Sequence, residues 1–514
     1  MNLNKNLHPR LFILILFCSI SIFTSCEKDT DLFAEIMAQN EAQALEDEKA
    51  ATEDSTATND VATQEIPEEP IIDTSFDDKA TILKAFPSAF GGGSNASGGR
   101  GGRIIHVTNL NNSGSGSLRE ALTATGPRIV VFDISGTIRI SSEIYVHDAS
   151  DLTIAGQTAP EGGITVTGDR ILFYKSNNVI IRYLRSRPAK VVGNPIPDDK
   201  KTASFLFWGG QDIILDHCSA SWAGDKAILF ATNIHGLPNR NFTTQKTIIA
   251  DSHTSVLLGV QSNGDYNSVD NISFTCNLIG NNTTRTPNMS GNGYFEIKNN
   301  VIHGWTSKLT TLNGGNSKVN HQGNYYKKPQ GVSLAYNRYQ PVSGKPEIYS
   351  NGNFYSGLLN GEANENNEII WINTSTNEQL SSDFFVDSPH SGNISNSFPT
   401  LTAQEAYDFV INDVGANKYY DNDGVVKTFL DSYDQSVINN TINNVRIEVK
   451  NSYSWVLPNL PSNVRPSNYD TDQDGMADAW ELRRFGDLTR SHSGDEDEDG
   501  YTNIEEFINQ VDFY

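Results

Sequence analysis

The sequence is short of three features that would each point to a different class of protein. Its 38 lysines and arginines are outnumbered by 62 acids, and no basic patch with interleaved aromatic residues stands out, so nucleic-acid binding is disfavoured. Apolar runs are scarce, and beyond the first 25 residues no segment is apolar enough to cross a bilayer. Regular alternation of strands and helices is also missing, which argues against a doubly wound sheet.

The negative charge is concentrated at the two ends of the chain. Residues 27–79 hold 17 acids and 3 bases, and residues 470–514 hold 14 acids and 3 bases. The residues between them, 80–469, carry a net charge of only −1. The body of the protein is therefore close to neutral.

The first 25 residues resemble a lipoprotein signal peptide. Lys5 and Arg10 precede a 13-residue apolar run, 11–23, which is too short to span a bilayer comfortably. Small residues then lead into Cys26, as in a bacterial lipobox, so we expect cleavage before Cys26 and lipidation of its thiol; a plain secretory signal is the alternative. Residues 26–79 are rich in acids and poor in aromatics, a composition typical of a disordered tether.

Four segments in the middle of the chain share an asparagine followed by apolar or aromatic residues. The aligned residues Asn277, Asn300, Asn324 and Asn353 are spaced by 23, 24 and 29 residues. A strand–turn–strand unit that recurs at this period cannot bury an apolar face alone, but stacked units can. Asparagine suits the turn, because it tolerates left-handed backbone angles and can form ladders up a stack. The repeat predicts an all-β fold, a right-handed parallel β-helix spanning residues 80–465.

Other segments fit this rod. A short helix expected at 117–122 would cap its N-terminal end, and residues 401–413 and 425–450 look partly helical. Cys218 and Cys276 fall two coils apart, which places them about 10 Å from each other, beyond the roughly 7 Å Cα separation of a disulfide. We therefore expect two buried thiols.

The C-terminal segment, residues 466–514, contains two 12-residue stretches of the EF-hand type. Each has oxygen-bearing side chains at positions 1, 3, 5, 9 and 12 and glycine at position 6, an arrangement that suits Ca²⁺. The predicted calcium ligands are Asp470, Asp472, Asp474, Asp478 and Glu481 in the first loop and Asp495, Asp497, Asp499, Asn503 and Glu506 in the second. With only short helices beside them, the loops fit a structural role, as in dockerin-like and thrombospondin-type repeats; an acidic solvated tail is the alternative.

Two stretches of the predicted rod contain charged residues that the fold alone does not require, and these residues are candidates for a functional site. Asp216 and His217 stand where an apolar strand meets a turn, and further along Arg285 directly precedes a Thr-Pro step. With other short stretches they resemble the polysaccharide lyase family 1 pectate lyases, in particular the long lipoproteins of Bacteroidetes. The matching stretches are residues 98–102, 114–122, 153–160, 216–222, 285–287 and 299–302.

The resemblance implies β-elimination on a uronic-acid polysaccharide such as pectate. In that family Ca²⁺ on the C6 carboxylate acidifies the C5 proton, an arginine matched here by Arg285 removes it, and the C4–oxygen bond breaks. Because an arginine side chain normally stays protonated, an alkaline optimum is expected. The resemblance makes Asp225 a calcium ligand and Asp216, His217 and Lys226 candidates for substrate binding, although Asp216 and His217 could instead brace the turn.

The chain departs from the family at three positions. No second arginine follows the Thr-Pro step, the calcium-binding acid expected before Trp208 is replaced by Ala203 or its neighbours, and Lys226 stands where glutamate is common. The loop acids Asp198 and Asp199 could replace the missing ligands. Alternatively, Lys226 could supply the positive charge that calcium would otherwise give.

Two other functions fit the same rod. A hydrolase of polygalacturonase type needs acid pairs about 6.5–9.5 Å apart, and its Asn-x-Asp with a following Asp-Asp pair does not occur in the coils. A non-catalytic glycan-binding rod would hold the polymer without cutting it. We expect a monomeric lyase with calcium and a uronic-acid polysaccharide as its ligands, attached to the outer membrane through the lipid alone and facing the periplasm or the cell surface.

Overall fold

The computed structural model describes residues 83–514 except 149, 189–202, 262–263 and 448–454. The predicted signal peptide, Cys26 and the acidic tether lie outside the described residues. Within the described part, none of the helices combines the length and the apolar character that a membrane crossing requires.

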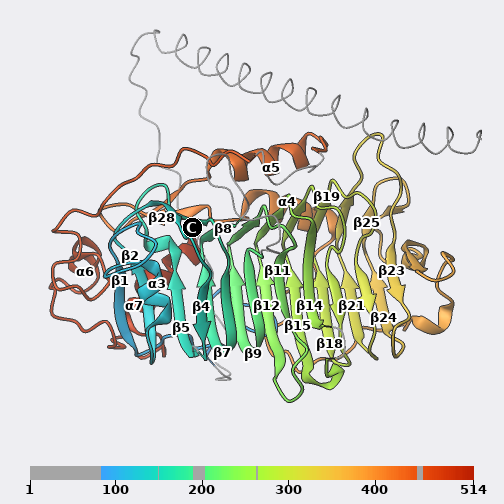
Figure 1. The fold of residues 1–514 in the computed structure, drawn as a ribbon, viewed down its shortest axis with the longest axis horizontal. Helices are drawn as coiled ribbons and strands as arrows, with labels where there is room; N and C mark the ends of the chain where they lie inside the picture. Colours follow the sequence, from blue (N-terminus) through green and yellow to red (C-terminus); the bar gives the residue numbers. More distant parts are fainter. Residues whose placement is uncertain (1–82, 149, 189–202, 262–263, 448–454) are drawn as a thin grey trace, which may run out of the picture. The chain divides into compact units, whose positions relative to one another are not determined.

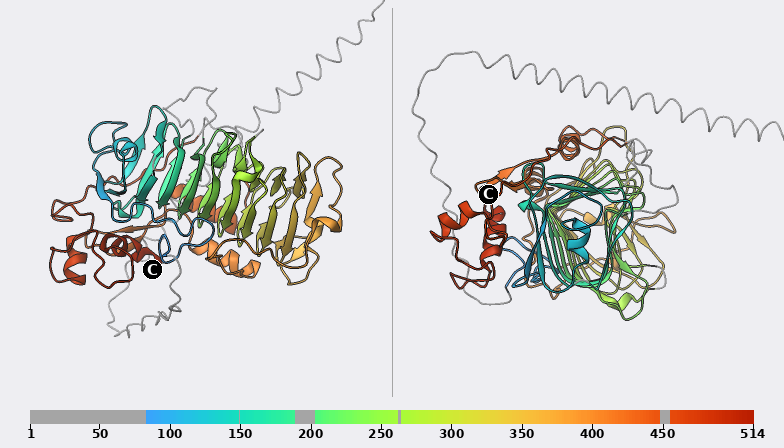
Figure 2. Two further views of the ribbon diagram at one scale, coloured as in Figure 1. Left: turned by 90° about the horizontal axis from the view of Figure 1, so that it is seen from below. Right: turned by 60° about the vertical axis from the view of Figure 1, so that its left-hand side comes forward.

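Parallel strands wind into a right-handed β-helix, as the asparagine repeat predicts (Figures 1 and 2). Each coil pairs in parallel with the next, for example Phe274 with Ile297 and Ile297 with His321. The strands form a 17-stranded sheet, which covers two faces of the rod, and a 10-stranded sheet, which covers the third. We name these faces A, B and C.

The three faces follow one another along each coil. Face A consists of β4 (Ile144–His147), the first parts of β7 (Ile171–Arg182) and β9 (Phe205–Asp216), β11 (Lys226–Thr232), β14 (Thr254–Val260), β17 (Asn288–Ser290), β20 (Thr311–Asn313), β23 (Asn337–Gln340) and β27 (Trp371–Asn373). Face B consists of β1 (Arg103–Val107), β2 (Arg128–Phe132), β5 (Ser150–Ala155), the second parts of β7 and β9, β12 (Asn239–Gln245), β15 (Val269–Thr275), β18 (Tyr294–Lys298), β21 (Lys318–Gln322) and β24 (Glu347–Asn351). Face C consists of β3 (Gly136–Arg139), β6 (Ile164–Thr167), β8 (Leu184–Arg187), β10 (Ser219–Ser221), β13 (Ile248–Ala250), β16 (Leu278–Gly280), β19 (Val301–His303), β22 (Tyr325–Lys327), β25 (Phe354–Tyr355) and β26 (Leu359–Asn360).

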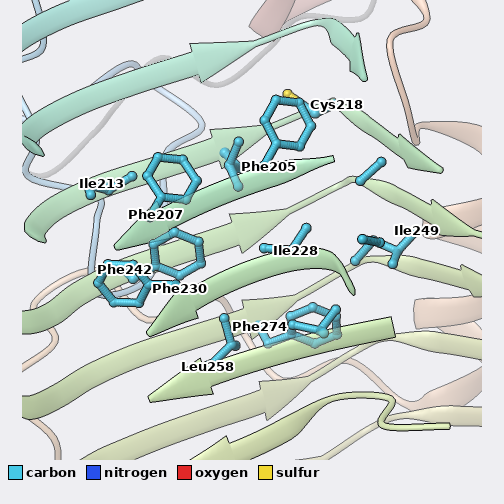
Figure 3. Close-up of a cluster of buried hydrophobic side chains, with 14 of the residues drawn as sticks. Phe205, Phe207, Ile213, Cys218, Ile228, Phe230, Phe242, Ile249, Leu258 and Phe274 are labelled. Carbon is cyan, nitrogen blue, oxygen red and sulfur yellow. The ribbon is translucent and has the colours of Figure 1, made fainter. Parts of the chain in front are cut away.

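The interior of the rod is filled by apolar side chains that stack from coil to coil. Phe173 and Phe207, on successive coils, stack with ring centroids 4.9 Å apart, and Phe230 stacks at 4.3 Å on Phe242 of the same coil. Figure 3 shows part of this core, in which Phe207, Phe230 and Phe242 lie near one another and Cys218 is also buried. Cys218 and Cys276 are both buried free thiols, as expected from the sequence.

The predicted asparagine ladder is present at the turn between faces B and C. The Asn277 amide donates to the side-chain oxygen of Asn300 at 3.1 Å, Asn300 to Asn324 at 3.0 Å, and Asn324 to Asn353 at 2.9 Å. Asn353 extends the ladder by donating to Asn367 at 2.8 Å. All of these side chains are buried, so the ladder satisfies polar groups that would otherwise be costly to bury.

Helices cover one end and one side of the rod. The short helix α3 (Leu118–Thr123) places Leu118 and Leu122 against the first coils, which confirms the predicted N-terminal cap. The helices α4 (Ala403–Asn412) and α5 (Ser432–Ile442) fall inside the two segments predicted to be partly helical. They pack on face C, where Val410 and Val437 join residues of β13, β16 and β19.

The acidic C-terminal segment is packed against the first coils of the rod. It contains α6 (Asp478–Arg484), α7 (Asn503–Asn509) and the 3₁₀ helix η5 (Gln510–Phe513), and the two helices match those expected beside the calcium loops. Phe507 and Ile504 of α7 share one apolar cluster with Ile129 and Val131 of β2. The C-terminal segment therefore shares an apolar cluster with the first coils of the rod.

Candidate functional site

Cationic side chains line the edge of face A where its strands begin. Lys226 starts β11 and pairs with Thr254 at the start of β14. Arg285 lies on the next coil, since its carbonyl accepts a hydrogen bond of 3.1 Å from Val256 N–H of β14. Lys308 lies one coil further, because Thr286 N–H donates to the Leu309 carbonyl at 3.3 Å. The stacking of coils therefore places three cations in one row, which we name the cationic row: Lys226, Arg285 and Lys308.

Arg285 occupies a turn with a left-handed backbone. Its φ is +66°, and the cis bond between Thr286 and Pro287 follows it. The residue is partly exposed, and the described part of the chain offers its guanidinium no hydrogen bond or ion pair. Arg285 therefore has a side chain available to a ligand, as a proton-transfer role requires.

The neighbouring Asp225 and Lys226 bind each other. Lys226 Nζ lies 2.8 Å from Asp225 Oδ2, with the side chains 10% and 27% exposed. Groups of three side chains able to share a metal ion occur, among the described residues, only in the C-terminal segment. Asp225 is thus a solitary acid engaged by a cation, which does not fit a calcium site. The proposed substitutes Asp198 and Asp199 lie outside the described residues.

Lys308 was not singled out from the sequence. It follows Arg285 by 23 residues, which equals the shortest interval of the asparagine repeat. That spacing is the signal that could have identified it, because equal intervals put residues on the same side of successive coils.

Asp216 and His217 are buried, with 0% and 1% of their surface exposed. Asp216 accepts hydrogen bonds from Arg182 Nε at 2.8 Å and from Gln245 at 2.8 Å, and its carboxylate lies 2.9 Å from His217 Nδ1. The His217 ring stacks on Tyr183 at 4.8 Å. Burial alone would raise the pKa of Asp216, but His217 and Arg182 outweigh it and hold that pKa well below its usual range.

This network corrects the expectation that the two residues bind substrate. A polymer on the surface cannot reach a carboxylate or imidazole that the protein covers completely. The second nitrogen of His217 lies 3.2 Å from Asp413, which comes from the segment after α4. The geometry supports the alternative that Asp216 and His217 brace the turn.

The first EF-hand-type loop gathers its carboxylates around a common point. Asp472, Asp474 and Glu481 lie within 4.8 Å of one another, as do Asp470, Asp472 and Asp478. Glu481 is completely buried, and neither of its carboxylate oxygens has a hydrogen-bond partner. Burial and the neighbouring acids raise the pKa of Glu481 to about 8, and burial raises that of Asp474 to about 7. Buried unpaired carboxylates at this spacing fit a calcium ion.

The second loop has the same ligand types but is more exposed. Asp495, Asp497 and Asp499 lie within 4.8 Å of one another. Unpartnered oxygens of the buried Asn503 and of Glu506 complete the expected set. Arg484 of α6 contacts Asp497 at 2.9 Å and Glu506 at 3.2 Å, so a protein cation balances part of this charge.

Comparison with known sequences gives relatives of one kind. No family model matches the chain. It is 40% identical over 251 residues to a probable pectate lyase C of Aspergillus terreus, a match that covers 48% of this chain and 55% of that protein, so the chain spans about half the length of this relative. It is 31% identical over 438 residues to a probable pectate lyase C of Aspergillus flavus, covering 84% of this chain and 94% of that protein.

Solved structures give weaker likenesses. A pectate lyase bound to a hexasaccharide has a TM-score of 0.48 at 16% identity, covering 66% of this chain and 99% of that one. Jun a 1, the major allergen from cedar pollen, has a TM-score of 0.47 at 19% identity, covering 64% of this chain and 92% of that one. The fold rests on the parallel pairings described above. The Aspergillus flavus match extends over most of both chains, and on that ground the chain belongs to the pectate lyase family.

Proposed function

We propose that the protein is a lyase that cleaves pectate, or a related uronic-acid polysaccharide, by β-elimination. The proposal is supported by the relationship to probable pectate lyases along 84% of the chain. The observation that assigns this activity to a site is the unpaired Arg285. It lies between Lys226 and Lys308 in the cationic row, at the edge of face A where the strands begin. Three cations in a row suit a polymer that carries a carboxylate on every sugar.

Arg285, in its neutral form, acts as the base in this proposal. It takes the proton from C5 of the uronate, the electron pair of that C–H bond forms the C4–C5 double bond, and the C4–oxygen bond breaks. The departing oxygen takes up a proton, and the new chain end is an unsaturated sugar. Since free guanidinium groups are protonated at neutral pH, we expect activity to rise towards alkaline pH.

Lys308, on the coil next to Arg285, holds a uronate carboxylate beside the base, whereas Lys226 lies two coils from Arg285 and is bound to Asp225. A cation near the C6 carboxylate stabilises the negative charge that develops when the C5 proton leaves. Because the described residues around Asp225 do not form a calcium site, we assign this charge stabilisation to Lys308.

An elimination assay tests the proposed function. The protein is incubated with polygalacturonate and with other uronate polymers, and ultraviolet absorbance reports the new C4–C5 double bond. We expect absorbance to grow with polygalacturonate. Reducing ends without absorbance would identify a hydrolase instead, and retention of polymer without either signal would identify a binding protein.

We also propose that both C-terminal loops bind calcium in a structural role. The buried, unpartnered Glu481 supports this most directly, because burying an uncompensated carboxylate is unfavourable unless a cation meets it. Calcium should raise the melting temperature, and the chelator EGTA should lower it. Glu481→Gln should remove one of two sites in a titration followed by calorimetry; an unchanged stoichiometry would contradict this assignment.

The lipid anchor at Cys26 remains a proposal drawn from the sequence, as does attachment to the outer membrane in the manner of Bacteroidetes lipoproteins. Labelled palmitate added to expressing cells should enter the wild-type protein and not Cys26→Ser. Labelling of both proteins to the same extent would refute the anchor.

A further inference from the structure

Four aromatic rings lie together on the outer surface of face A, towards the N-terminal end of the rod. We name this group the aromatic stripe: Tyr145 and His147 of β4, Tyr174 of β7 and Trp208 of β9. Their neighbours Ile144, Val146, Phe173 and Phe207 point into the core, so the rings of the stripe face outwards. Tyr145 is 43% exposed, and the His147 side chain is 48% exposed.

The stripe is in register across three successive coils. His147 pairs with Tyr174, and Tyr174 pairs with Trp208. The His147 and Tyr174 rings are stacked with centroids 5.1 Å apart, and Tyr145 lies 5.8 Å from Tyr174. These contacts join the Tyr145, His147 and Tyr174 rings, and the strand register places Trp208 next to Tyr174 along the axis of the rod.

The same row continues with small residues towards the cationic row. Beyond Trp208 it passes Ala231 and Gly259 to Ser290, the last residue of β17. At Gly259, whose φ is +124°, a Cβ would come within 1.8 Å of the Ser290 carbonyl, so this position stays without a side chain. Arg285 lies at the other end of the same coil segment. Ala231, Gly259 and Ser290 are themselves buried, and this register places the aromatic stripe three coils from the coil of the proposed base.

Exposed aromatic faces at regular spacing suit the ring faces of sugars. The C–H groups on one side of a pyranose ring make an apolar patch that stacks on an aromatic face, while its hydroxyl groups stay in water. Lys175 Nζ lies 5.2 Å from the centre of the Tyr174 ring and brings a positive charge to the stripe. Asp148 lies 2.8 Å from His147 and brings a negative charge as well, so the match to a polysaccharide rests on the ring faces. Contiguous exposed rings of this kind are uncommon on a surface that binds nothing.

We propose that the aromatic stripe binds the polysaccharide at a distance from the reaction site and holds the polymer along face A. The inference rests on the proposed function for the identity of the polymer. A chain bound at both places would dissociate more slowly than one bound at the cationic row alone, since the two contacts act together. The aromatic stripe therefore increases the affinity for long substrates and does not change the affinity for short ones.

The test compares Tyr174→Ala with Tyr349→Ala, a partly exposed tyrosine of face B. For Tyr174→Ala we expect KM for polygalacturonate to rise roughly three- to tenfold, in keeping with the loss of one aromatic contact. Neither KM for trigalacturonate nor the melting temperature should change. Tyr349→Ala should behave as wild type with both substrates. An equal rise of KM for the polymer and the trimer, or no rise for either, overturns the proposal.

Binding without catalysis separates this inference from the proposed function. Retardation of the full chain in gels that contain polygalacturonate measures affinity whether or not the polymer is cut. If wild type is retarded and Tyr174→Ala much less so, the stripe binds polymer even when no unsaturated product forms. If both proteins are retarded equally, or neither is, the stripe is not a binding site for this polymer.

Discussion

Arg182 of β7 and Asp512, two residues from the C-terminus, form an ion pair inside the protein although 330 residues separate them. Arg182 also donates to Asp216 at 2.8 Å and to Asn509 at 3.2 Å. Its guanidinium lies 3.8 Å from the centre of the Phe86 ring. One buried cation thus ties the rod to the last helix of the calcium-loop segment and to the segment that precedes the first strand.

Replacing that cation should destabilise the folded protein. Arg182→Met leaves Asp216 and Asp512 buried without their shared partner, so we expect a loss of about 3–5 kcal/mol in the free energy of unfolding. Urea unfolding followed by circular dichroism measures it, with the exposed Arg240→Met as the matched control. A loss below about 1 kcal/mol would show that the pair is not a main link between these parts.

The proposed base predicts a large kinetic effect. Arg285→Lys should lower kcat on polygalacturonate by roughly a hundredfold or more, in keeping with the loss of a positioned proton acceptor. The melting temperature should stay the same, because the guanidinium makes no hydrogen bond or ion pair with a described residue. The exposed Arg240→Lys serves as control. Retention of full activity by Arg285→Lys would exclude Arg285 as the base.

Lys308 predicts an effect on binding of the carboxylate. Removing one cation of the cationic row should raise KM for polygalacturonate about threefold to tenfold in Lys308→Ala, with less effect at high ionic strength because salt screens exposed charges. The exposed Lys318→Ala on face B should leave KM for polygalacturonate unchanged at both low and high ionic strength. Identical kinetics for the two variants at low salt would remove Lys308 from the site.

Asp251 predicts a dependence of stability on pH. Burial raises its pKa to about 7, even though Tyr433 donates a hydrogen bond of 2.6 Å to it. An unfolded aspartate titrates near 3.9, so the folded state loses stability as pH rises from about 4 through 7. Asp251→Asn should therefore raise the melting temperature at pH 8, by roughly 2 °C or more, and change it little at pH 4. A shift of equal size at both pH values, or one shared by the exposed Asp387→Asn, would contradict this account.

The repeating parts of the molecule were predictable because their signal is local and periodic. The interval between the asparagines predicted the coil length and the position of the turn. The spacing of the acidic residues predicted the two calcium loops, and α6 and α7 lie beside them. The acidic partners of His217 and Arg182 were not predictable in this way. Asp413 and Asp512 come from segments without repeats, and their approach depends on how the C-terminal third folds back on the rod.

The cationic row and the aromatic stripe could not be predicted from the sequence, for a related reason. The alignment of Lys226, Arg285 and Lys308 depends on the lengths of the turns between them, and the coil of Thr254 lies between those of Lys226 and Arg285. Arg285 could be identified from the sequence because a Thr-Pro step follows it. The only signal for Lys308 is its separation of 23 residues from Arg285. The aromatic stripe likewise depends on strand register, since His147, Tyr174 and Trp208 are separated by 27 and 34 residues.

The asparagine ladder determines where this protein tolerates insertions. From Asn277 to Asn353 every coil returns to the same turn, although the coils differ in length by up to six residues. The extra residues are therefore taken up at the other two corners, and face A begins at one of them. A residue inserted beside Asn300 would shift one amide out of line and leave two buried polar groups unpaired. The same insertion in a corner beside face A would only lengthen a loop, so new substrate contacts can arise there without cost to the stack.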